Sequence, residues 1–179
     1  MSKRVLIKAS KLNEGGLMLF NGAQIHMLVN HLPVIGFLGM VLALAVAMKV
    51  QSIDIKRFVL LATVVVGASA LAPYWTGESA EEVIEHLPGV SKDLIHEHEE
   101  LAEKATVFSL ITAVAAGVAF FLQRRRPETL RKSIPVVFVL SLVTAGVIGA
   151  AAHEGGKIRH PEINPDAGAL PSQTTKDQD

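Results

Sequence analysis

Four long stretches without Asp, Glu, Lys or Arg constrain this chain more than any other feature of its sequence. A transmembrane α-helix needs about 20 consecutive, mostly apolar residues to cross the hydrocarbon core of a bilayer. Four stretches are long enough, and they cover residues 15–48, 58–77, 105–123 and 133–153. The sequence therefore predicts an all-α integral membrane protein, folded as a four-helix bundle with the lipid bilayer around it.

Helix-end signals set the expected limits of the first two spans. We expect the first helix over residues 23–49, with Asn21 as its N-cap. Pro33 lies inside this helix and should kink it, because proline lacks a backbone donor. The second helix should end near Gly77, just after a Tyr-Trp pair placed where an interfacial aromatic belt would hold it.

The segment between the second and third spans, residues 78–104, is strongly acidic. It carries nine carboxylates and only two lysines. Residues 79–86 have amphipathic spacing and are followed by a Pro-Gly pair, so we expect a short amphipathic acidic helix there. Ser91 has the chemistry of an N-cap, which places the start of the third helix near Lys92, outside the membrane.

The fourth span should end at His153, because the Gly-Gly pair at 155–156 is a helix-termination signal. From residue 164 onward the composition is typical of disorder. We therefore expect an N-terminal polar segment (1–20) without a signal peptide, a transmembrane domain (21–163) and a disordered C-terminal tail (164–179).

Basic residues are concentrated in the loops after the first and third spans, at Lys49, Lys56, Arg57, Arg124, Arg125, Arg126, Arg131 and Lys132. The positive-inside rule predicts that these loops are cytoplasmic. Both termini and residues 78–104 are then expected on the outer side, although the basic N-terminus favours the opposite orientation.

Composition excludes several functional classes. The formal net charge is zero, which argues against a nucleic-acid partner. The absence of cysteine excludes a disulfide, an iron–sulfur cluster and a covalently attached c-type haem. No ionisable carboxylate or cation lies deep in a span, as a proton-driven transporter usually requires. Since no Walker, dinucleotide-binding or Ser-His-Asp pattern is present, we expect an electron-transfer or accessory subunit rather than a stand-alone enzyme.

The histidines are the best candidates for a functional site, because the predicted topology places all seven on the side of the termini: His26, His31, His86, His96, His98, His153 and His160. His98 shares a helical stripe with small residues, and small residues mark helix–helix contacts in membranes. His153 follows Gly146 and Gly149 on a similar stripe. We therefore expect both histidines to point into the bundle.

The first span offers His26 and His31, which lie about 140° apart around a helix. His31 is deeper and is the better candidate. The expected constellation is therefore His31, His98 and His153, with His26 and Glu78 in reserve.

Three hypotheses remain open for this constellation. The first is non-covalent haem b, with two imidazoles as axial ligands between the helices. The second is a non-haem Zn, Cu or Fe site formed by His31, His98 and His153 with the Glu78 carboxylate. The third is no cofactor at all, in an accessory or anchoring subunit of a larger membrane complex.

Several motifs resemble those of known sequences. The patterns His26-x4-His31-x-Pro33, Thr76-Gly-Glu and Gly-Gly-x-Ile-Arg-His-Pro-Glu at 155–162 resemble a group of uncharacterised bacterial four-helix membrane proteins. The first and last are also similar to motifs of a broader family of unknown function, which has Phe at the position of Leu32. The resemblance implies a bacterial inner-membrane protein. It supplies no established activity, but a redox role is commonly suggested for such proteins, with other membrane or redox subunits, or quinone, as partners.

Overall fold

The computed structural model describes residues 20–160 and residue 163. All regular structure in this part of the chain is helical, in α2 (Gly22–Lys49), α3 (Ile53–Ser69), α4 (Leu71–Ile84), α5 (Lys92–Leu122) and α6 (Thr129–Arg159). Four helical units are long and apolar enough to cross a membrane, with α3 and α4 together forming the second. The predicted all-α, four-span membrane bundle is therefore confirmed.

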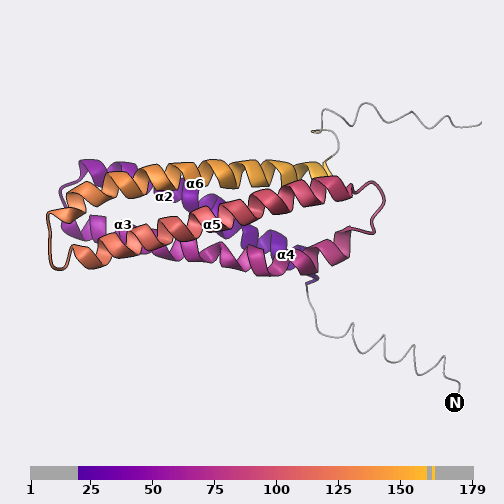
Figure 1. The fold of residues 1–179 in the computed structure, drawn as a ribbon, viewed down its shortest axis with the longest axis horizontal. Coiled ribbons are helices and arrows are strands. Elements are labelled where there is room, and N and C mark those ends of the chain that lie inside the picture. Colours follow the sequence, from indigo (N-terminus) through magenta and orange to yellow (C-terminus); the bar gives the residue numbers. More distant parts are fainter. Residues whose placement is uncertain (1–19, 161–162, 164–179) are drawn as a thin grey trace, which may run out of the picture.

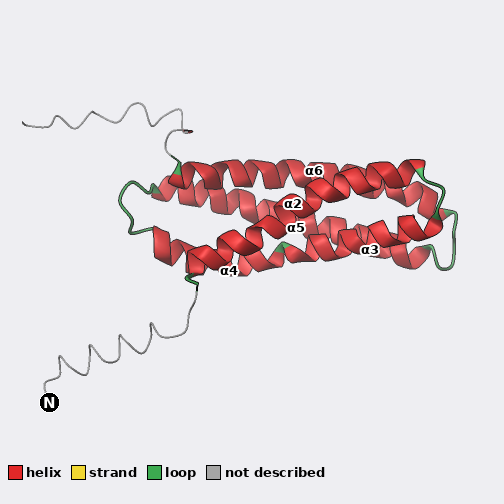
Figure 2. Ribbon diagram, turned by 180° about the vertical axis from the view of Figure 1, so that it is seen from behind, coloured by secondary structure: helices red, strands yellow, loops and turns green. Residues whose placement is uncertain are grey.

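Successive spans run in opposite directions along the bundle (Figure 1). α5 packs on α6 and α3, while α2 packs on α6, α4 and α3, so α2 and α5 are diagonal partners. One end of the bundle carries the start of α2, the α4–α5 connection and the end of α6; the other carries the α2–α3 and α5–α6 loops (Figure 2). All seven histidines belong to the first end, as expected.

The limits of the first and third spans agree with the sequence. Asn21 is the N-cap of α2 and forms a capping box with Gln24: its side chain accepts the Gln24 N–H at 2.9 Å, and the Gln24 side chain accepts the Asn21 N–H at 3.0 Å. Pro33 lies inside α2 and is buried. α5 begins at Lys92, after Ser91.

The second span differs from the expectation that it ends near Gly77. The break lies at Ala70, and α4 then continues through the acidic segment to Ile84. Pro73 explains why the helix can continue, because it falls in the first turn of α4, where its missing N–H breaks no helical hydrogen bond. The separate amphipathic helix expected over residues 79–86 is therefore wrong; most of that segment is the last part of α4.

The fourth span also continues further than expected. α6 starts at Thr129 and passes through Gly155 and Gly156 to Arg159. Glycine costs a helix only about 1 kcal/mol relative to alanine, so it does not by itself end one. Here the pair lies where other parts of the chain approach α6 closely. The N-terminal segment up to residue 19 and the C-terminal tail from residue 164 lie outside the described residues.

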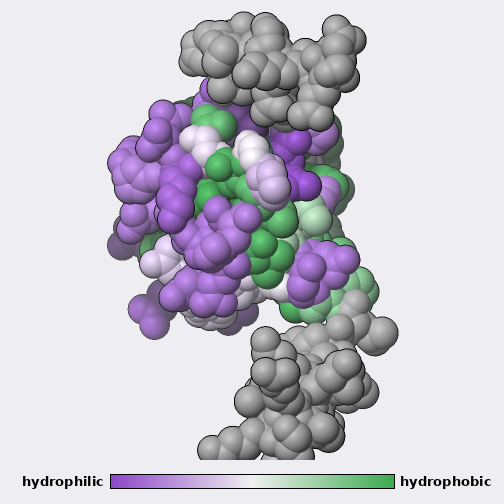
Figure 3. Space-filling model, turned by 90° about the vertical axis from the view of Figure 1, so that its right-hand side faces the viewer, coloured by the Kyte–Doolittle hydropathy of each residue, from purple (hydrophilic) through white to green (hydrophobic). Residues whose placement is uncertain are grey.

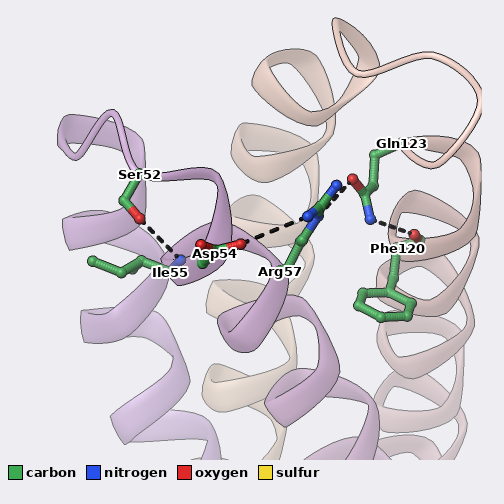
Figure 4. Close-up of polar contacts among 6 residues, drawn as sticks. All are labelled: Ser52, Asp54, Ile55, Arg57, Phe120 and Gln123. Carbon is green, nitrogen blue, oxygen red and sulfur yellow. Dashed lines mark hydrogen bonds and ion pairs between the residues drawn. The ribbon is translucent and has the colours of Figure 1, made fainter.

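The two ends of the bundle are built differently. The loop end has a solid apolar core formed by Leu44, Ala47, Val59, Leu60, Ala116, Ala119, Leu130, Ile134 and Val137. There the Arg57 side chain donates a hydrogen bond at 2.9 Å to Gln123, which ties α3 to α5 (Figure 4). Further along, small and hydroxylated residues bring helices together, as where the Thr112 and Thr144 hydroxyls meet at 2.9 Å.

Candidate functional site

The histidine end of the bundle contains a cavity of about 800 Å³. α4 packs mainly on α2 and makes few contacts with α5, so space remains between the four helices at this end. Many of the lining residues are small or apolar, among them Ala70, Gly77, Ala102, Ala105, Ala151 and Gly155. In the end-on view, hydrophobic residues are visible at the centre and hydrophilic ones gather over one side (Figure 3). A volume of this size is typical of ligand and cofactor sites.

His26 and His98 meet at this cavity, although they belong to the diagonally opposed helices α2 and α5. Their ring centroids are 6.4 Å apart, and the ring planes are nearly perpendicular, at 87°. Both residues line the cavity and are partly buried. The pair therefore joins two helices that otherwise do not pack directly against each other.

The His98 ring is held by α6. Its Nδ1 lies 2.8 Å from the backbone oxygen of Ala151. A carbonyl oxygen can only accept, so Nδ1 must carry the proton and donate it. In a neutral His98 the lone pair is therefore on Nε2. Gly155 makes room for this placement, because a Cβ atom there would lie 2.9 Å from Cε1 of His98.

The His26 ring is held in the same way by α4. Its Nδ1 lies 3.2 Å from the hydroxyl oxygen of Thr76, and that hydroxyl donates its own proton to the backbone oxygen of Ala72 at 3.0 Å. Because the Thr76 hydroxyl has backbone acceptors for its own proton, its oxygen can accept from Nδ1–H of His26; in that tautomer the lone pair is on Nε2. Donation of the second ring N–H to a fixed acceptor is the usual arrangement of a metal-ligating histidine.

The other histidines of the expected constellation lie elsewhere. His31 is exposed, and its Nδ1 lies 2.6 Å from the Met27 backbone oxygen of its own helix. His153 is exposed too, and so are Gly146 and Gly149, where an added Cβ would meet nothing within 4 Å. The expectation that His153 and this glycine stripe face inward is therefore wrong.

His153 faces outward because of how α6 is rotated about its own axis. This helix carries two stripes of suitable residues, and the one that faces the core is formed by Val137, Ser141, Thr144, Ile148 and Ala151. Spacing alone does not show which stripe of a membrane helix meets protein and which meets lipid, since both are free of charge.

The ligand set of the metal hypothesis is not brought together in the described residues. Within residues 20–160 and 163, no group of three His, Asp or Glu side chains is placed to hold a metal ion. Glu78 lines the cavity but is exposed, and it does not gather with His31, His98 and His153.

Carboxylates dominate the charge around the cavity. Five glutamates line it, and Glu81 of α4 lies against Glu99 of α5. Arg159, at the end of α6, is the one Lys or Arg among the residues that line this cavity. The site is therefore an apolar cavity with two oriented imidazoles inside and a predominantly acidic rim.

Sequence reasoning kept His26 and His98 among the candidates but missed the groups that orient them: Thr76, Ala151 and Gly155. The Thr76-Gly-Glu and Gly-Gly motifs were the available signals, since they contain Thr76 and Gly155. A comparison with known proteins finds no match for this chain among protein-family models, curated proteins or solved structures.

Proposed function

We propose that this is a membrane electron-transfer protein that binds one non-covalent haem b between His26 and His98. The 6.4 Å separation of the two ring centroids supports this proposal most directly. With a metal–nitrogen bond of about 2 Å to each ring, one metal ion between two imidazoles would place the ring centroids about 6 Å apart. The centroid separation of the observed pair is therefore compatible with one metal ion held between His26 and His98.

The surroundings of the pair also fit a haem. The cavity of about 800 Å³ is lined by small and apolar side chains, which allow a flat macrocycle to lie close to helix backbones. Arg159 supplies a cation for a propionate. Because Nδ1 of each histidine donates to a fixed acceptor, each imidazole keeps Nε2 for the iron.

A haem with two histidine ligands supplies a one-electron carrier without an open coordination position. Electron transfer therefore fits this site better than oxygen binding or substrate oxidation at the iron. In the bacterial inner membrane, with the histidine end on the outer side, quinone or a redox subunit would exchange electrons with the protein.

Absorbance spectroscopy of the purified full-length protein tests the proposal. We expect a Soret band, and sharp α and β bands after reduction with dithionite, as for low-spin bis-histidine haem. His26→Ala and His98→Ala should each abolish or strongly shift these bands. His31→Ala and His153→Ala are matched controls, because both side chains are exposed, and their spectra should be unchanged.

Two outcomes would contradict the proposal. Protein expressed with ample haem and purified without any Soret band would rule out haem as its cofactor. Bands that survive both His26→Ala and His98→Ala, but are lost in His31→Ala, would show that the ligands lie elsewhere.

A further inference from the structure

A second cavity lies at the opposite end of the bundle, far from the histidines. It has a volume of about 180 Å³ and is lined by residues of α2, α3 and α6: Met48, Lys56, Arg131, Ile134 and Pro135. This volume corresponds to about six water molecules, which is enough for a phosphate group. Two of its five lining residues are cations, and the others are apolar.

The two cations are available for a ligand. Within the described part of the chain, neither the Lys56 ammonium nor the Arg131 guanidinium has an ion-pair or hydrogen-bond partner. The adjacent Arg57 differs: its guanidinium lies 3.6 Å from Asp54, and it also donates to Gln123 (Figure 4). The Arg57 guanidinium is therefore paired within the protein, whereas the ammonium of the neighbouring Lys56 faces the cavity.

We propose that this cavity binds the phosphate headgroup of an anionic phospholipid. Arginine matches phosphate geometry with paired N–H donors, and lysine adds a point charge. Met48 and Pro135 are exposed and supply apolar surface beside the charges, as the glycerol and upper acyl chains of a lipid require. Basic pockets between transmembrane helices at the cytoplasmic side are typical sites for such headgroups.

A membrane lipid suits the site better than a soluble phosphate because of its position. The cavity lies where α2 ends and α6 begins, at the limit of two apolar spans. Met48 is itself 41% exposed, so the rim of the cavity presents apolar surface outward. A soluble anion would gain nothing from that surface.

Lipid binding to the purified full-length protein in a neutral detergent tests this inference. Native mass spectrometry should detect one retained phosphatidylglycerol at concentrations where phosphatidylcholine is not retained. The double variant Lys56→Gln/Arg131→Gln should bind phosphatidylglycerol at least tenfold more weakly, whereas Lys56→Arg/Arg131→Lys, which keeps both charges, should retain binding. Circular dichroism would check that each variant folds.

Arg125→Gln/Lys132→Gln is the matched control, since it removes two charges from the same end of the bundle without touching the cavity. Its affinity should stay within about threefold of the original, because a neutral detergent micelle lacks the negative surface potential of an anionic bilayer. Equal losses in both double variants would overturn the inference, because net charge would then explain binding. Full displacement of the lipid by millimolar inorganic phosphate would also overturn it, in favour of a soluble anion.

Discussion

At the scale of single residues, the candidate site depends on the groups that orient the imidazoles. Ala151 and Thr76 each accept an Nδ1–H, so both rings are fixed from helices other than their own. Gly155 has no side chain, and this leaves the space that the His98 ring occupies. None of these three residues would touch an iron, yet each determines where Nε2 of a histidine points.

Thr76→Val should weaken haem binding by about 10- to 100-fold, because the isosteric valine cannot accept the Nδ1–H of His26. Haem titration of the apoprotein, followed at the Soret band, measures this change. Thr106→Val is the matched control: Thr106 also lines the cavity, but its hydroxyl donates only to Ala102 of its own helix at 2.9 Å. Equal affinities for the two variants would remove Thr76 from the site.

Gly155→Ala should displace the His98 ring, since the new Cβ would lie 2.9 Å from its Cε1. We expect a loss of bound haem and a destabilisation of about 1–3 kcal/mol, as for other overpacked positions. Gly149→Ala on the same helix meets open space and should be neutral, or stabilising by up to about 1 kcal/mol. Haem content and thermal unfolding report the two effects separately; retention of haem by Gly155→Ala would contradict the role given to this contact.

At the scale of the helices, the sequence predicted helix ends that depend on nearby residues. It did not predict features that depend on packing between helices. The position of Asn21 as the N-cap of α2 and the start of α5 at Lys92 were predictable, because helix-end signals act within a few residues. The Ser91 side chain itself makes no capping hydrogen bond. The end of the second span was not predictable, because the charges that begin at Glu78 limit the apolar stretch but not the helix, which continues to Ile84. The inward placement of His153 was wrong for a related reason, since the rotation of α6 about its axis is set by its neighbours.

Close helix approach is a property of this same scale. Gly67 of α3 meets α5, where an added Cβ would lie 2.6 Å from the Ser109 oxygen and 2.7 Å from the Ala113 Cβ. Gly67→Ala should therefore force α3 and α5 apart and lower the thermal unfolding temperature, with a cost of about 1–3 kcal/mol. Gly39→Ala in α2, where nothing lies within 4 Å, is the control and should not lower it. Equal unfolding temperatures would mean that the interface adjusts without cost.

At the scale of the whole molecule, charge and packing differ between the two ends of the long axis. The histidine end is acidic and contains the cavity of about 800 Å³. The loop end is basic, is tied by Arg57 and Gln123, and has a packed apolar core beside its cavity of about 180 Å³. This polarity also gives an expected orientation, because basic loops stay in the cytoplasm. Under the two proposals, the haem site would then lie on the outer side of the membrane and the lipid site on the inner side.

Single-cysteine labelling tests the orientation, and the natural absence of cysteine makes it direct. In intact spheroplasts, a membrane-impermeant maleimide should label Pro88→Cys in the α4–α5 connection and spare Gln51→Cys in the α2–α3 loop. Permeabilised cells, in which both positions should react, provide the control. Labelling of Gln51→Cys alone in intact spheroplasts would reverse the assignment.

The meeting of His26 and His98 across the diagonal has a consequence for how the protein could be studied. α2 and α5 supply the rings, while α4 and α6 supply the acceptors, so one small cluster depends on the relative positions of all four spans. A ligand that binds only this assembled cluster stabilises the folded state by mass action. An optical signal from that ligand would therefore report whether the four spans are correctly packed. Helix content does not report this, because separate helices in a membrane would give a similar value.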